Sequence, residues 1–178
     1  MVSLADIKKD LPEWPDDVIE QWLLYFANES DCGWPPPEPL GAHRWAGLFG
    51  GKPLSWWRQV IWRKVTTRCG LDDLASKAKA DVSDIVTKFN AGRADASTKK
   101  RVSQPWIYIR ENGSFPRALV TMQRADGMSL LDGSHRMAAF VLVQSLSDVD
   151  LAKINGKRPS LNQAVWRGEH SNGELPDH

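Results

Sequence analysis

A cluster of polar residues early in the last third of the chain is the part of the sequence best suited to chemistry. The segment Asp132–Arg136 reads Asp-Gly-Ser-His-Arg, and it lies between a short apolar run and a longer apolar stretch. A turn that ends a strand and begins a helix leaves backbone N–H groups without internal partners, and the helix dipole adds partial positive charge there. His135 and Arg136 add two side-chain donors. The pattern therefore predicts a phosphate-binding site.

Each member of this segment has a chemical interpretation and a plainer one. Arg136 remains charged and its planar guanidinium suits phosphate oxygens, but it could equally form a surface ion pair. His135 is predicted to donate to a phosphate or to act as an acid or base near neutral pH. Ser134 either contacts the phosphate or caps the helix. Asp132 would repel a phosphate unless it caps the turn, orients His135 or coordinates Mg²⁺.

Three more residues are predicted to complete this site. The backbone of Gly133 is expected to approach the phosphate, and Glu111 and Arg117 flank a predicted hairpin from which they could reach the pocket. If Arg136 binds the phosphate, Arg136→Ala should weaken ATP affinity by about 10- to 150-fold, because a charge-assisted contact contributes about 1.5–3 kcal/mol. The fold is expected to survive this change, since a charged residue at a helix start is seldom part of a core.

The elements around the segment follow from periodicity and turn residues. Helical spacing predicts a helix from Pro15 to about Phe26. Pro53 is expected to begin a second helix that continues to Arg68, and Leu71 a third that ends at Phe89. The proline-rich stretch 34–39 is predicted to be a stiff linker.

The second half of the chain is predicted to contain the sheet. Residues 91–103 are expected to form a mobile loop, followed by strands over 106–110, 117–123 and 129–131. Asn112-Gly113 and Asp126-Gly127 are predicted turns between these strands. A helix should then run from Ser134 to about Leu146, with a last strand over 161–166 and a disordered tail from Ser171.

The composition bounds the class of protein. With 178 residues, of which 42% are hydrophobic, the chain suits one globular domain with an N-terminal extension. Net charge is +1, but residues 52–117 hold 14 basic and 6 acidic side chains, whereas residues 1–51 hold 3 basic and 9 acidic. The basic segment could contact a polyanion such as DNA through Lys99, Lys100 and Arg101, without sequence preference. It could instead pair with the acidic segment.

Cysteine and tryptophan usage give two further expectations. Cys32 and Cys69 are the only cysteines, no apolar run approaches ~18 residues, and no signal peptide begins the chain. We therefore expect reduced thiols and a cytoplasmic location. Seven of the nine tryptophans lie within the first 62 residues. They are expected to form a local core, the alternative being a surface for a partner.

The spacing Asp132-Gly133-x-His135-Arg136, followed by a small residue at Ala139, resembles the signature of the ParB/sulfiredoxin superfamily. The resemblance implies an α+β fold with a small mixed sheet packed by helices, in which the strand–turn–helix unit binds nucleotide phosphates. It covers residues 71–168. With the extension it implies three regions: a helical tryptophan-rich extension over 1–52, a phosphate-binding core over 53–168 and a flexible tail over 169–178.

Two departures from the family narrow the expected function. Sulfiredoxins carry a reactive cysteine where this chain has Ser134, so their chemistry is not expected. Partition proteins of the ParB type carry a helix-turn-helix and a dimerisation segment after the core, which residues 169–178 do not provide. The size and layout are more similar to the fertility-inhibition proteins of conjugative plasmids, including the oncogenic-suppression (Osa-type) branch, which are bacterial.

That resemblance implies an enzyme that hydrolyses ATP and cleaves DNA, and so blocks DNA transfer by a competing conjugative element. Its expected catalytic residues are Asp132, His135, Arg136 and Glu111, with ATP as substrate and a divalent metal, Mg²⁺, held at Asp132. One alternative is a non-enzymatic inhibitor that binds a type IV secretion or coupling protein. Another is a small-molecule kinase or ADP-ribosyltransferase of the same fold.

Overall fold

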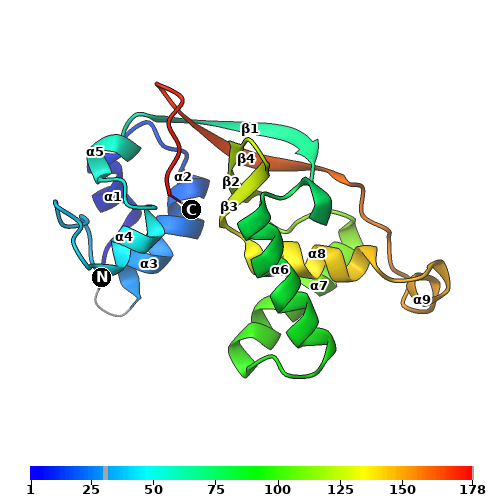
Figure 1. The fold of residues 1–178 in the computed structure, drawn as a ribbon. Helices are drawn as coiled ribbons and strands as arrows, with labels where there is room; N and C mark the ends of the chain where they lie inside the picture. The colour runs from blue at the N-terminus through cyan, green and yellow to red at the C-terminus, as the bar shows by residue number, and fades with distance from the viewer. Residues whose placement is uncertain (30–31, 178) are drawn as a thin grey trace. The chain divides into compact units, whose positions relative to one another are not determined.

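The computed structural model describes residues 1–29 and 32–177, and it has an α+β fold with a four-stranded sheet (Figure 1). The chain divides into two compact units. Unit 1 comprises Met1–Arg63 and Trp166–His178, and unit 2 comprises Lys64–Val165. The strands occur in the order β1-β4-β2-β3 across the sheet. This division differs from the predicted regions 1–52, 53–168 and 169–178, because unit 1 combines residues from both ends of the chain.

Unit 1 is helical apart from its strand segments. Its helices are α1 Leu4–Asp10, α2 Asp16–Val18, η1 Ile19–Leu23, α3 Leu24–Asn28, α4 Arg44–Leu48 and α5 Leu54–Trp57. The three segments from α2 to α3 follow one another directly, and η1 is a π-helical turn. The helix predicted from Pro15 is therefore confirmed.

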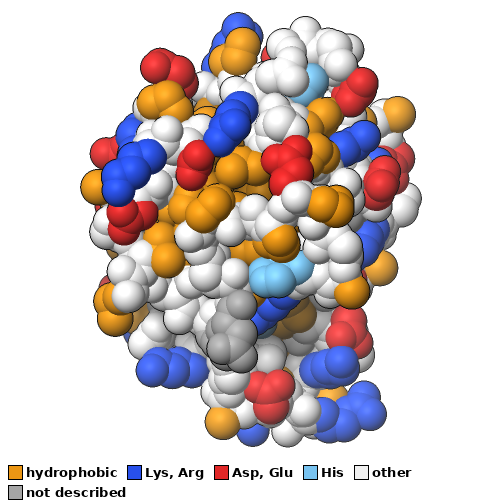
Figure 2. Space-filling view, turned by 90° about the vertical axis from the view of Figure 1, so that its left-hand side faces the viewer, with side chains coloured by type: hydrophobic (Ala, Val, Ile, Leu, Met, Phe, Trp, Pro, Cys, Tyr) orange, Lys and Arg blue, Asp and Glu red, His pale blue; other side chains and the backbone are white. Residues whose placement is uncertain are grey.

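Tryptophan rings form the core of unit 1. Trp14, Trp22, Trp45 and Trp57 are each at most 2% exposed. The ring centroids of Trp14 and Trp22 lie 6.1 Å apart in a stacked arrangement, and Trp57 meets Trp22 edge-on at 5.3 Å. The expected local core is confirmed. Figure 2 shows a face of the molecule on which hydrophobic, basic and acidic side chains lie close together, so no single charge type dominates that face.

The C-terminal segment 171–177 belongs to unit 1 and is hydrogen-bonded to it. The backbone N–H groups of Ser171 and Asp177 donate to carbonyl groups of residues 59 and 50. Trp56 Nε1 donates to the Glu174 carboxylate at 2.7 Å, and the His170 ring stacks on Trp56 with centroids 4.2 Å apart. The disorder predicted from Ser171 onward is therefore wrong for the described residues of this segment, because these contacts hold it against the helices.

Unit 2 contains the Asp132–Arg136 segment and the elements around it. They are η2 Leu71–Asp73, α6 Ser76–Asn90, α7 Ala96–Asn112, β2 Leu119–Arg124, β3 Gly127–Asp132, α8 Ser134–Gln144 and α9 Asp148–Lys153. Strands β1 Val60–Arg68 and β4 Asn162–His170 pass from one unit into the other. Helices α6, α7 and α8 share an apolar core with β2 that includes Val82, Val102, Leu119, Met137 and Phe140. The predicted helix from Ser134 and the predicted last strand are confirmed.

Two predicted segments have the wrong secondary structure. The helix predicted from Pro53 to Arg68 is in fact the short α5 followed by strand β1. Its apolar positions fit a helix, but β-branched residues such as Val60, Thr66 and Thr67 favour an extended chain. The third predicted helix also begins later than Leu71, because η2 precedes α6.

Most of the loop predicted over 91–103, and all of the strand predicted over 106–110, belong to helix α7. Asp95 caps its start by accepting from the Thr98 N–H at 2.8 Å, and Pro105 is accommodated inside it. Gly113, at the predicted hairpin turn, instead ends this helix in the left-handed conformation at φ +70°. The antiparallel hairpin is β2–β3, where Arg124 pairs with Gly127. The turn predicted before β3 is confirmed.

The basic residues of the segment 52–117 form ion pairs both with the acidic segment 1–51 and with acidic residues of their own segment. Arg58 pairs with Asp10 at 2.7 Å, which joins the basic segment to the acidic one inside unit 1. Other lysines pair within the basic segment itself: Lys77 with Asp81, Lys79 with Asp72, and Lys88 with Asp84. In the described residues, no helix is both long enough and apolar enough to cross a membrane.

Candidate functional site

The turn from β3 into α8 has the strand–turn–helix form that the sequence predicted. Its N-cap is Gly133, at φ +109°, and Ser134 is the first residue of the helix. A Cβ atom at Gly133 would lie 2.5 Å from a methyl group of Leu119 and 3.1 Å from Arg136 Nη2. A side chain is therefore excluded by both backbone conformation and space. Glycine also leaves the first turn of α8 without a side-chain cap, as an anion site at a helix start requires.

Arg136 is directed into the protein by three hydrogen bonds. Its Nη1 donates to the carbonyl oxygens of Arg117 at 3.0 Å and Ala118 at 3.4 Å, while Nη2 donates to the Asp132 carboxylate. The Arg136 side chain is only 13% exposed, and that of Asp132 is 21% exposed. These contacts join the end of β3, the start of α8 and the chain entering β2. Sequence reasoning gave Arg136 either a phosphate or a surface ion pair, whereas the structure shows a largely buried pair with Asp132.

Asp132 lies in an environment that opposes its ionisation. Burial raises the pKa of its carboxyl group above the ordinary value, although the positive charges of Arg136, Arg101 and Arg117 act in the opposite direction. The charges of three arginines therefore act on one partly buried carboxyl group. Of these arginines, Arg136 contacts Asp132 directly, and the Arg117 backbone contacts Arg136.

His135 lies beside residues from the start of α7. Burial lowers the pKa of its half-buried imidazole, the Arg101 charge lowers it further, and Asp95 raises it. His135 in turn contributes to a lowered pKa of Asp95, after the larger effect of the Thr98 backbone N–H. An imidazole with a lowered pKa is neutral near pH 7 and can accept a proton. The α7 start thus supplies Asp95 and Arg101 to the α8 turn.

The structure brings together some of the predicted residues and separates others. Gly133, Ser134, His135, Arg136, Asp132 and the backbone of Arg117 lie at the α8 turn, and the charge of Arg101 on α7 acts on Asp132 and His135. Glu111 is ten residues beyond Arg101 on the same helix, roughly 15 Å away along its axis, and pairs with Arg110 at 3.7 Å. Asp95 was missed by sequence reasoning, although an Asp at the N-cap is a recognisable helix-start signal.

The donor set suits phosphate groups better than it suits a metal ion. His135 and the backbone of the α8 start provide donors, and the positive charges of Arg101 and Arg117 act on the same turn. Asp132 is a single carboxylate that already accepts from Arg136. Within residues 1–29 and 32–177, no three or more His, Cys, Asp or Glu side chains gather where they could hold a metal ion. The expected Mg²⁺ site at Asp132 is therefore not part of a group of three or more such side chains in the described residues.

The lowered pKa of His135 leads to a prediction about stability. Because the folded-state pKa is below the unfolded-state value of about 6.5, neutral His135 contributes stability at higher pH that is lost as pH falls through the folded-state pKa. We expect the free energy of unfolding to decrease between pH 7 and 5, and to decrease less in His135→Gln. Urea unfolding across this range measures both. Asp132 and other groups titrate both in the unchanged chain and in His135→Gln. If the free energy of unfolding depended on pH equally in the two, the prediction would be contradicted.

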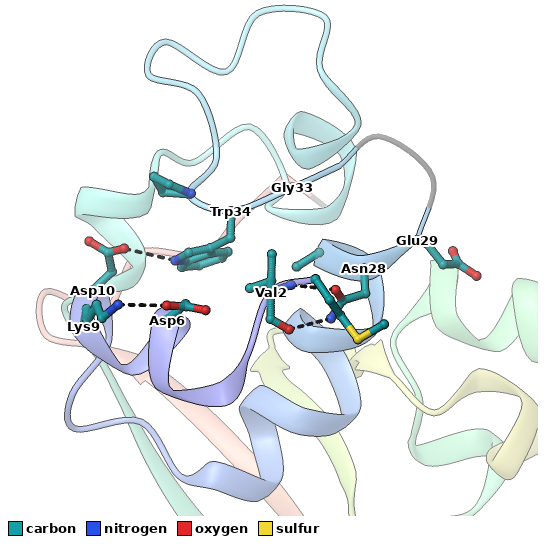
Figure 3. A pocket seen from close by; sticks show the side chains of 11 residues that line it. Val2, Asp6, Lys9, Asp10, Asn28, Glu29, Gly33 and Trp34 are labelled. Atoms are coloured by element: carbon teal, nitrogen blue, oxygen red, sulfur yellow. Dashed lines mark hydrogen bonds and ion pairs between the residues drawn. The ribbon is translucent and has the colours of Figure 1, made fainter.

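A pocket in unit 1 offers no comparable chemistry. It measures about 640 Å³ and is lined by Val2, Asp6, Asp10, Asn28 and Trp34, among others (Figure 3). Its polar groups bind one another: Asp6 accepts from Lys9, Asp10 accepts from Trp34 Nε1 and from Arg58, and Asn28 bonds to the backbone of residue 2. The α8 turn is therefore the better candidate.

Comparison of the sequence with protein families, curated proteins and solved structures finds no match.

Proposed function

We propose that the α8 turn binds the phosphates of a nucleotide, and that the chain is an ATP-hydrolysing, DNA-cleaving protein of the ParB/sulfiredoxin type that blocks DNA transfer by a competing conjugative element. The observation that supports this most is the uncapped start of α8, where His135 lies and where the charges of Arg101 and Arg117 act on Asp132. Cationic side chains and backbone N–H groups at one helix start are the features that phosphate binding requires.

The proposed division of labour follows from the contacts. Arg101 and Arg117 donate to phosphate oxygens and stabilise the charge that develops on them. Neutral His135 accepts a proton from the attacking water as the new P–O bond forms and the bond to the leaving phosphate breaks. Arg136 and Asp132 hold the turn rather than the substrate. A Mg²⁺ ion would be held by the nucleotide phosphates and Asp132, since Mg²⁺ at nucleotide sites commonly takes one or two carboxylates plus phosphate oxygens.

DNA is proposed to contact the exposed lysines of α7. Lys99 and Lys100 are exposed and directly precede Arg101, so a bound strand would lie beside the nucleotide site. A cytoplasmic location remains part of the proposal. The alternative of an inhibitor that docks on a secretion or coupling protein loses its main support, because the tryptophans that would form the docking surface are mostly core residues.

Hydrolysis and DNA cleavage by the purified chain, with and without Mg²⁺, test the proposal. We expect Arg101→Ala to weaken nucleotide binding about 10- to 150-fold, from one lost charge-assisted bond. His135→Gln should lower kcat by about 10²–10⁴, as loss of a general base does. Lys153→Ala, which changes an exposed pair on α9, is the matched control. Unchanged kinetics in both site variants would refute the site, and phosphate transfer to an alcohol instead of water would favour the kinase alternative.

A further inference from the structure

Helix α7 exposes two kinds of side chain in succession along its solvent side. Lys99 and Lys100, in its first half, are exposed and form no ion pair with the residues that the structure describes. Ile107 and Tyr108, in its second half, are 47% and 40% exposed, which places them among the exposed large hydrophobic residues of the described chain. Cations and a flat aromatic ring thus share one helix.

The helical repeat places Lys100, Ile107 and Tyr108 on one side of α7, with Lys99 at its edge. Positions 100, 104, 107 and 108 are separated by four, three and one residues, so they form one face, and the buried Val102 and Ile109 lie on the opposite side against the core. Lys100 and Tyr108 are eight residues apart, which is roughly 12 Å along the axis. Gln104, between them, is exposed, and its amide can both donate and accept hydrogen bonds. The face is therefore accessible and polar between its basic end and its aromatic end.

We propose that this face of α7 binds single-stranded DNA, with a backbone phosphate at Lys100 and an unstacked base against Tyr108. Lys99 lies about 100° round the helix from Lys100, at the edge of the face, where it meets a neighbouring phosphate. Cations that follow a backbone, combined with an exposed aromatic ring on which bases stack, are how proteins bind single strands without sequence preference. A duplex would satisfy the lysines but not Tyr108, because its bases are already stacked and only their edges are accessible.

The inference rests on the proposed function only in treating the bound DNA as the substrate that is cleaved. It specifies that this DNA is single-stranded. Arg101 follows Lys100 directly and acts electrostatically on both Asp132 and His135. The basic end of the face is therefore the end beside the α8 turn. A strand bound on this face has its phosphates next to the proposed hydrolytic site and a base farther along α7.

Fluorescence anisotropy with a labelled 20-nucleotide oligo-dT, without nucleotide or metal, tests the proposal. The full chain should bind this strand more tightly than a duplex of the same length. Tyr108→Ala should weaken binding by about 5- to 150-fold, the effect of losing one base–aromatic contact. Tyr108→Phe should keep the affinity, and Tyr25→Ala should not change it, since Tyr25 is 44% exposed but lies on α3. Lys99→Gln combined with Lys100→Gln should reduce the salt slope by about 1.4.

The outcomes separate this proposal from the function proposed above. Binding that depends on Tyr108 in a chain that hydrolyses no nucleotide would support the α7 face and refute only the enzyme. A second outcome is that nucleotide hydrolysis depends on His135, while the Tyr108→Ala variant melts normally and binds the strand as tightly as the unchanged chain. That outcome would refute only the α7 face. Equal affinity for duplex and single strand, or tighter binding of an RNA of the same length, would also overturn it.

Discussion

Replacing Arg136 with alanine is expected to lower the free energy of unfolding by about 3–5 kcal/mol, the cost of removing one partner of a buried ion pair. The change leaves the buried Asp132 carboxyl group without its guanidinium, and it leaves the Arg117 and Ala118 carbonyl oxygens without their donor. At about 2–4 °C per kcal/mol, the melting temperature should fall by roughly 6–20 °C. The sequence alone suggested that the fold would survive this change unaffected, and the inward direction of Arg136 reverses that expectation.

Two comparisons make the Arg136 result specific. Lys153→Ala removes an exposed pair with Asp150 on α9, so it should cost no more than about 1 kcal/mol. Adding Asp132→Asn to Arg136→Ala should recover part of the loss, because the carboxyl group that was left unpaired is then absent. Calorimetric melting measures all three variants. A loss equal to that of Lys153→Ala would show that the Asp132–Arg136 pair does not hold the turn.

Trp22→Ala is expected to lower the free energy of unfolding by a similar amount, about 3–5 kcal/mol. Trp22 is fully buried, and its ring contacts Trp14, Trp57 and Phe49 at centroid distances of 5.3 to 6.1 Å. Removing the indole leaves a cavity among aromatic rings that are too large to close over it. Urea unfolding followed by tryptophan fluorescence provides the measurement.

The control for Trp22 lies three residues away. Tyr25 follows on the same run of helix but is 44% exposed, so Tyr25→Ala should cost less than about 1 kcal/mol. Trp22→Phe should also be milder than Trp22→Ala, because it fills part of the space and the buried Trp22 Nε1 has no hydrogen-bond partner to lose among the described residues. If Trp22→Ala were as mild as Tyr25→Ala, the tryptophan cluster would contribute little to stability.

The sequence predicted best where local signals agreed. At the α8 turn, an apolar run, a glycine and a helical pattern all indicated the same structure, and the prediction was confirmed. Between residues 53 and 110 the signals conflicted. Val60, Ile61 and Val65 fit a helical face, yet they lie in a strand, where β-branched side chains pack well. Conversely, Trp106–Arg110 has strand propensity, but its packing against the unit 2 core makes it helical.

The candidate site was predictable only in its local part. Gly133, His135 and their neighbours are adjacent in sequence, so a motif reveals them. Arg101 and Asp95 reach the same place from more than 30 residues away, because α7 packs against α8. No pattern in the sequence shows such a contact. The Asp132–Arg136 pair has the i, i+4 spacing of a helical ion pair, but Asp132 lies outside the helix, so helix rules did not identify it.

The composition of unit 1 from both ends of the chain has a consequence for the order in which the protein folds during synthesis. Unit 2 is a continuous segment, so it can fold once residue 165 has left the ribosome. Unit 1 must wait for the Trp166 indole to reach Asp17 and for Glu174 to reach Trp56, contacts that close loops of more than 100 residues. The Cys69 N–H donates to the Leu161 carbonyl within unit 2. Folding of unit 2 therefore shortens those loops in advance and lowers the entropy cost of completing the tryptophan core.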